Sequence, residues 1–180
     1  MRKPLMFTLV VAVIGLGLPA GADMFGFDLA AQVGYAQLHK IERPFENAEA
    51  TLAGGVVGVR AKLEIMFISA IVDYQHFFDN ADYLHAGLGI DFKLPTPVIE
   101  PFIRGSVGLM FLSADKSMFD PAAETDLERA LGFQLRGGVG LDIPLGSWFA
   151  IGAAGDVGYH YMTGRHGWDF SVVGYLGLRV

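Results

Sequence analysis

Charged residues recur inside stretches that otherwise read as apolar β-strands, and they are the first candidates for chemistry. They carry both signs, and within each stretch they share one parity of residue number, which places them on one face of a strand. Buried charges of opposite sign pair with each other rather than stand alone. The set therefore predicts ion pairing, either as a self-satisfied plug or as a gate that opens a small ion path when one pair switches. Its members are Arg60, Asp73, Asp91, Arg104, Arg136, Asp142 and Asp156, with Asp28, Lys62, Glu64, His160 and Arg179 on the same faces.

Histidine is the second candidate for chemistry, because the chain has 5 histidines and no cysteine. A lipid-modifying hydrolase would need one of them within reach of a serine and a carboxylate. His76 and Ser69 have opposite parity and so face opposite sides of their segment. His160 shares a face with Asp156 but has no serine near it. We therefore predict that the chain is not an enzyme and has no catalytic residues.

Metal, cofactor and nucleic-acid sites are not predicted either. The acidic segment 112–130 lacks the Asp-x-Asp-x-Asp-Gly spacing of a calcium loop, so we expect a solvated acidic loop there. The chain has a net charge of −6 and no cluster of basic residues, which argues against a nucleic-acid partner.

The elements that must position these charges alternate with a period of two. Apolar residues occupy every second position, and glycine or a charged residue stands between them, which is a strand pattern. Short turns near Ile65, at 94–98 and at 144–147 alternate with longer connections, of which 39–50 and 113–130 are the longest. Eight segments are predicted, at 25–35, 57–64, 68–75, 84–93, 103–111 and 168–180, with two more inside 135–161.

The apolar face of these strands is predicted to face lipid. A soluble barrel of the lipocalin type would turn that face inward, but glycines between the charges suit a narrow polar lumen. Aromatic residues also gather at both ends of the strands, as they do at the two interfaces of a bilayer. The expected girdles are Phe25, Phe27, Phe92 and Phe149 near the short turns, and Tyr35, Tyr74, Phe111, Phe133, Tyr159, Tyr161, Trp168 and Phe170 near the long loops.

The predicted fold class is therefore all-β, an eight-stranded antiparallel up-and-down transmembrane β-barrel. An unpaired edge is costly in lipid, so the segment of Phe25 should close against that of Trp168. Leu88, Val107, Val139 and Val157 should then point outward, while Arg104 and Arg136 point into the lumen.

The N-terminus reads as an export signal. Arg2 and Lys3 precede an apolar run at 5–18, and Ala20 and Ala22 stand in the small-x-small arrangement of a cleavage site. The run is shorter than the ~20 residues that a membrane-spanning helix needs. We predict a cleaved signal peptide at 1–22 and the barrel at 23–180.

From Phe25 to Val180, the alternation, the strand number and segments such as GVGLDIPLG make the chain resemble the small eight-stranded bacterial outer-membrane barrels. The transmembrane domain of outer-membrane protein A belongs to this class. The resemblance implies a monomer in the bacterial outer membrane, in contact with membrane lipid and lipopolysaccharide and inserted by the outer-membrane assembly machinery. Such barrels usually end on an aromatic residue, whereas this chain ends on Val180, with Leu176 and Leu178 keeping the alternation.

Eight strands enclose a space that side chains fill, which excludes a general porin. We predict a structural or surface-interaction role, with the lumen plugged by charge pairs and the loops at 39–50 and 113–130 facing outside. The alternatives are a small gated channel, a lateral transporter of hydrophobic molecules, an adhesin and, against the histidine argument, a lipid-modifying enzyme.

Counting residues around the turns predicts which charges meet. If Pro144 pairs with Trp148, then Arg136 faces Asp156 across the sixth and seventh segments. The same counting places Asp73 diagonally beside Arg60, and Asp91 diagonally beside Arg104. Glycines at 58, 89, 108 and 138 would make room for the guanidinium groups.

Overall fold

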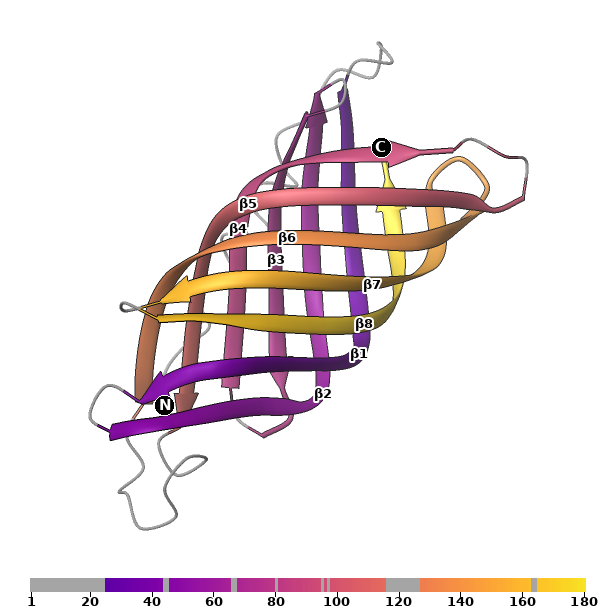
Figure 1. Cartoon of the computed structure of the whole chain (residues 1–180). Helices are drawn as coiled ribbons and strands as arrows, with labels where there is room; N and C mark the ends of the chain where they lie inside the picture. The colour runs from indigo at the N-terminus through magenta and orange to yellow at the C-terminus, as the bar shows by residue number, and fades with distance from the viewer. Residues whose placement is uncertain are drawn as a thin grey trace.

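The computed structural model describes residues 25–43, 46–65, 68–79, 81–94, 96, 98–115, 127–162 and 165–180. The predicted signal peptide, 1–22, lies outside the described residues. Eight strands follow one another along the chain (Figure 1): β1 (Phe25–Arg43), β2 (Glu46–Ile65), β3 (Ile68–Phe77), β4 (Ala81–Lys93), β5 (Glu100–Asp115), β6 (Leu127–Leu145), β7 (Phe149–Met162) and β8 (Arg165–Arg179).

The strands form a closed antiparallel barrel in which each strand pairs with its neighbours in the sequence. β8 returns to β1, from the pair Asp28 and Arg179 to the pair Leu38 and Asp169. Closure leaves no free edge around the barrel wall, which is the reason that the segments of Phe25 and Trp168 were expected to meet. The predicted eight-stranded antiparallel barrel is confirmed. None of the described residues belongs to a helix that is long and apolar enough to cross a membrane.

The two faces of the barrel wall differ as the alternation predicted. Leu88 and Val139 lie on the outer face with 60% of their surface exposed, and Val107 and Val157 are exposed beside them. Arg136 points inward and is buried. The lipocalin-like arrangement, which would bury the apolar side chains and expose the arginine, is therefore wrong for this chain.

At one end of the barrel the first two strands are longer than predicted. We call this end, where the long loops were predicted, the loop end. Residues 39–50 were predicted to be a loop, but β1 continues to Arg43 and β2 begins at Glu46, with His39 paired to Thr51. β8 reaches only Leu38 on one side of this hairpin, and β3 reaches only Val56 on the other. A ribbon of two strands therefore extends beyond the barrel wall. Both faces of such a ribbon tolerate water, so its polar sequence lacks the alternation that marks the wall.

The second predicted long loop, 113–130, is shorter than expected. β5 runs to Asp115 and β6 begins at Leu127, and the residues between them lie outside the described residues. At the opposite end of the barrel, here the turn end, Gly146 adopts a positive φ of 77° in the tight connection between β6 and β7. A residue with a side chain is strained in that conformation.

The interior near the loop end is apolar, which the sequence analysis did not predict. Seven large inward side chains from five of the strands pack together there, each with less than 5% of its surface exposed; we call them the apolar cap: Leu38, Leu52, Val56, Phe77, Met110, Leu112 and Met162. The predicted plug of charge pairs therefore describes only the part of the lumen nearer the turn end.

Candidate functional site

Charged side chains fill the half of the lumen nearer the turn end, below the apolar cap. At its centre Arg60, Arg104 and Arg136 converge on two carboxylates, Asp73 and Asp156, and we call these five residues the arginine cluster. They come from β2, β5, β6, β3 and β7, so five strands around the barrel each send one inward residue to the same place. Asp73 has no exposed surface, and Asp156 has 1%.

Each carboxylate of the arginine cluster serves two or more guanidinium groups. Asp73 Oδ2 accepts hydrogen bonds from Arg60 Nη2 at 2.7 Å and Arg136 Nη1 at 2.6 Å, and its Oδ1 accepts one from Gln32 Nε2 at 2.5 Å. Asp156 binds Arg104 through two bonds, from Nε at 2.7 Å and Nη2 at 2.5 Å. Arg136 bridges the two carboxylates, because its Nη2 also lies 3.1 Å from Asp156 Oδ2. Fork-like pairing of this kind fixes geometry as well as charge.

A second group of charges, the mouth cluster, surrounds an opening at the turn end. Lys62 Nζ lies 2.9 Å from Asp28, 2.9 Å from Glu64 and 2.7 Å from Asp91. On the other side, Arg179 pairs with Glu100 at 2.8 Å and with Asp142, which also accepts a hydrogen bond from Tyr175. Lys93 lies between the two sides, 3.8 Å from both Asp28 and Asp142.

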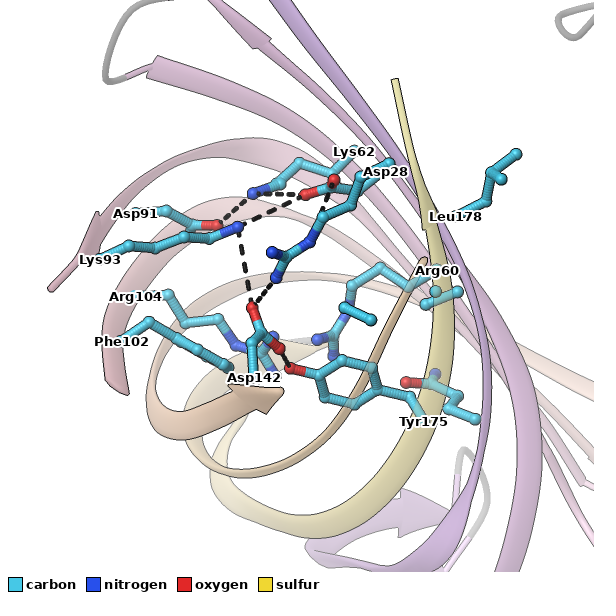
Figure 2. Close-up of a pocket in the computed structure, with 15 residues that line it drawn as sticks. Asp28, Arg60, Lys62, Asp91, Lys93, Phe102, Arg104, Asp142, Tyr175 and Leu178 are labelled. Atoms are coloured by element: carbon cyan, nitrogen blue, oxygen red, sulfur yellow. Dashed lines mark hydrogen bonds and ion pairs between the residues drawn. The ribbon is translucent and has the colours of Figure 1, made fainter. Parts of the chain in front are cut away.

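The mouth cluster encloses a cavity of about 60 Å³. Figure 2 shows Asp28, Lys62, Asp91 and Lys93 gathered on one side of it, while Leu178 points away through the wall. Arg60 and Arg104 form its inner boundary, so the cavity leads from the turn end down to the arginine cluster. A polar space of this size holds several waters.

The predicted charge pairs are correct in kind and partly wrong in detail. Arg136 does contact Asp156, but it faces Gly158, because Leu145 rather than Pro144 closes the turn, opposite Phe149. The predicted register was therefore wrong by two residues, and the contact is diagonal. Arg60 faces Asp73 directly rather than diagonally.

The pair of Asp91 and Arg104 was predicted wrongly. The two residues do face each other across β4 and β5, yet Asp91 binds Lys62 of β2 and Arg104 binds Asp156 of β7. The lumen is narrow enough for long side chains to reach past the adjacent strand. Counting around turns relates only adjacent strands, so it misses contacts across the lumen.

Glycine makes room in this site for a carboxylate rather than for the arginines. A Cβ at Gly138 would collide with the carboxylate of Asp156, its partner in the register. At Gly58, Gly89 and Gly108 the nearest obstacle to a Cβ is a backbone carbonyl oxygen of the adjacent strand. These three positions therefore allow the strands to approach closely.

A polar relay separates the arginine cluster from the apolar cap. Tyr83 donates to Gln134 Oε1 at 2.6 Å, and Gln134 Nε2 donates to Asp169 Oδ2 at 2.7 Å. His160 Nδ1 lies 3.3 Å from the same oxygen of Asp169. His160 is therefore inside the barrel, as its parity predicted, although its partner is Asp169 and not Asp156. Gln134 and Tyr83 were not predicted as site residues, because the sequence pattern marks charged residues and histidine, and neutral side chains of the same parity carry no such signal.

On the outer face near the loop end, His76 and Tyr74 meet one carboxylate. Asp82 Oδ1 lies 2.9 Å from His76 Nδ1 and accepts a hydrogen bond from Tyr74 at 2.6 Å. Ser69 is fully buried inside the barrel and so does not face His76. Register places Ser113 beside Asp82, a neighbour that parity counting within one segment cannot find.

The predicted aromatic girdles lie on the outer face. Tyr159 and Trp168 form an edge-to-face pair with ring centroids 5.0 Å apart. Phe27, Tyr74 and Phe111 are half-buried, and the other nine are exposed: Phe25, Tyr35, Phe92, Phe133, Phe149, Tyr159, Tyr161, Trp168 and Phe170.

The sequence matches no family model and no curated protein sequence. The structure does resemble solved barrels. It superposes on Neisserial surface protein A with a TM-score of 0.60 at 14% identity, over 86% of this chain and 96% of the other. The N-terminal β-barrel domain of Pseudomonas aeruginosa OprF gives a TM-score of 0.50 at 12% identity, over 84% and 97% of the two chains. At these identities the comparison establishes a shared fold.

Proposed function

We propose that this chain is a closed, non-conducting barrel of the bacterial outer membrane, which carries its ribbon and loops on the outer surface. The observation that carries the proposal is the filled lumen. The mouth cluster, the arginine cluster, the polar relay and the apolar cap occupy successive levels from the turn end to the loop end. An eight-stranded barrel has little interior beyond what such side chains fill.

The outer face supports placement in a bilayer. Exposed apolar side chains such as Leu88, Ile103, Val139 and Val172 cover the wall, far more than a soluble monomer leaves in one patch. Aromatic side chains lie toward both ends of this band, as at the two interfaces of a membrane. The two solved barrels of the same fold, one of them named a surface protein, agree with this placement.

The ribbon of β1 and β2 supports a role at the surface. It extends past the ends of β3 and β8, so its strands stand clear of the lipid-facing wall. It is therefore a part of the chain that a partner outside the membrane would meet. Deleting residues 41–49 and measuring adhesion of whole cells tests whether the ribbon carries the interaction.

Orientation is testable by cysteine labelling, because the chain has no cysteine of its own. Thr51 lies exposed on the ribbon and Ser147 lies exposed in the turn between β6 and β7. A membrane-impermeant maleimide should label Thr51→Cys in intact cells, and Ser147→Cys only after the outer membrane is permeabilised. The reverse pattern would overturn the proposed orientation.

Closure is testable by conductance. The purified barrel in a planar bilayer should give no current above that of the lipid alone, while a porin inserted in the same bilayer conducts. Steady single-channel steps from the wild-type barrel would refute a closed lumen and favour the gated channel.

A further inference from the structure

A groove of about 560 Å³ runs across the outer face of the barrel wall, from β4 to β8. Every described residue that lines it is apolar. Phe92 and Ile103 stand out from the wall at the groove, with 66% and 62% of their surface exposed, while the small residues Ala153 and Gly155 leave the wall low. Ligand pockets usually measure about 300–1,000 Å³, so the groove is large enough to hold a ligand.

Gly155 lines the groove, although neither the backbone nor the packing of the barrel requires a glycine there. Among the described glycines only Gly146 has a positive φ. A Cβ at position 155 would meet no atom closer than the carbonyl oxygen of Ser171, at 3.9 Å. β7 pairs with β6 and β8 past Gly155 without a bulge. A glycine inside a strand weakens it, and it often marks either a bulge or the close approach of a ligand. Gly155 therefore indicates that a ligand approaches the backbone at this point of the wall.

The groove begins at the turn end and finishes near the middle of the wall. Leu94 lines its first part and follows β4 directly at the turn end, where its backbone N–H donates to the carbonyl oxygen of Pro101. Val172 lines its last part and lies midway along β8. The groove therefore spans the half of the wall nearer the turn end. In the proposed membrane this is the depth of one leaflet.

The occupant that fits the groove is a flexible apolar chain that enters from the turn end. No polar side chain lines the groove among the described residues, so nothing there would bind a sugar or a peptide backbone. The groove is also continuous with the exposed apolar wall, which lipid covers in the proposed placement. A chain inside the groove contacts the protein on several sides, and many small dispersion contacts together hold it more firmly than lipid that touches the flat wall.

We propose that the groove binds one acyl chain of a phospholipid from the leaflet at the turn end. The headgroup lies at the membrane surface beside Leu94, and the chain extends past Ile103 and Leu141 to Gly155. In the proposed orientation this leaflet faces the periplasm, and lipopolysaccharide lies in the other leaflet. The inference rests on the proposed placement of the wall in a bilayer, and it adds a lipid that stays with the barrel.

Retention of lipid tests this groove. The barrel is extracted from outer membranes in a mild detergent, and its bound lipid is counted by native mass spectrometry. One phospholipid per barrel should stay bound. Ala153→Leu places a larger side chain in the groove and should lose the phospholipid. The matched control is Ala70→Leu, because Ala70 is also exposed on the outer face, on β3, but does not line the groove. This variant should retain the phospholipid.

A titration of the wild-type barrel tests the same site without any substitution. The delipidated barrel is titrated with lysophospholipids, each of which has a single acyl chain, and binding is followed by native mass spectrometry. A long-chain lysophospholipid should bind more tightly than a short-chain one with the same headgroup, because it fills more of the groove. Exchange of the phosphoethanolamine headgroup for phosphoglycerol at constant chain length should leave the affinity unchanged, since no polar side chain of the described residues lines the groove.

Several results would overturn the proposal. They are equal retention of phospholipid in the two alanine variants, retention of lipopolysaccharide in its place, and affinity that follows the headgroup rather than the chain. A dimer mass that Ala153→Leu abolishes would assign the groove to a second copy of the chain. None of these results bears on the placement of the barrel in the outer membrane, which cysteine labelling tests separately.

Discussion

The arginine cluster and the apolar cap both lie inside the barrel, but they close the lumen by different physics. Cap side chains such as Phe77 and Met110 fill space by packing and leave no polar atom unsatisfied. Taking the ions of the arginine cluster out of water costs free energy that pairing recovers only when every partner is present. The cap should therefore tolerate the replacement of a member by one of similar volume, whereas the arginine cluster depends on each carboxylate.

The largest loss of stability is expected where the arginine cluster loses its most buried carboxylate. Asp73 serves Arg60, Arg136 and Gln32 at once. Asp73→Ala leaves the guanidinium groups buried without their counter-ion, so the free energy of unfolding should fall by about 3–5 kcal/mol. Urea titration followed by tryptophan fluorescence measures this, because the chain has 2 tryptophans.

The matched control is Asp82→Ala, on the outer face. Asp82 also has two side-chain partners, Tyr74 and His76, but 47% of its side chain is exposed. Its removal should cost much less, because water solvates what remains. Equal losses of unfolding free energy in the two variants would mean that burial does not make the carboxylates of the arginine cluster more important for stability than an exposed one.

A truncation in the apolar cap should lower the free energy of unfolding somewhat less than Asp73→Ala does. Met110 is fully buried among its neighbours, and Met110→Ala should lower the free energy of unfolding by about 2–5 kcal/mol through lost burial and a cavity. Met110→Leu, which nearly conserves volume, should cost less than about 1.5 kcal/mol. No apolar replacement of similar size rescues Asp73, since the arginines remain. If Met110→Leu lowered the free energy of unfolding as much as Asp73→Ala in the same titration, the apolar cap would not tolerate replacements better than the arginine cluster.

On the outer face, the effect of a new charge should depend on whether its surroundings are lipid or water. Val139 has 60% of its surface exposed on the wall, and Val139→Arg should cost about 2–4 kcal/mol in a bilayer if it lies near the midplane. Thr51→Arg on the ribbon, where water is expected, should cost almost nothing. Unfolding from lipid vesicles measures both. Similar stability of the two variants would place Val139 outside the hydrocarbon.

The barrel wall was predictable because burial on one face imposes a period of two, which is local in sequence. Leu88 and Val139 were placed correctly from parity alone. The ribbon was missed for the complementary reason: His39 and Thr51 lie where neither face must be apolar, so no period marks them as strand. The apolar cap was missed with it, since Leu38 and Leu52 lie outside the predicted strand segments 25–35 and 57–64.

The charge pairs were less predictable, because they depend on non-local geometry. The turn between β6 and β7 contains Gly146 at a positive φ and is one residue further along the chain than predicted. Arg136 therefore faces Gly158 in the register, whereas Asp156 was predicted. Contacts such as Arg136 of β6 with Asp73 of β3 cross the lumen between strands that are not adjacent. The closure and width of the barrel decide these contacts, and both are properties of all eight strands together.

The smallest loss of stability is expected at the mouth cluster. It tests whether access to water, rather than the presence of charge, makes the mouth cluster differ from the arginine cluster. Arg179 pairs with Glu100, but these side chains are 24% and 22% exposed, so solvent screens the pair. Glu100→Gln removes this pair and leaves Arg179 with its second carboxylate, Asp142, so it should cost about 0.2–1 kcal/mol, as for exposed ion pairs. The loss should shrink at high salt, where the screening length falls to about 3 Å at 1 M. The loss from Asp73→Ala should stay constant under the same change, because ions do not reach between buried partners. If Glu100→Gln were as costly as Asp73→Ala and equally insensitive to salt, the mouth would be dry, and the two charged clusters would be one buried unit that reaches the turn end.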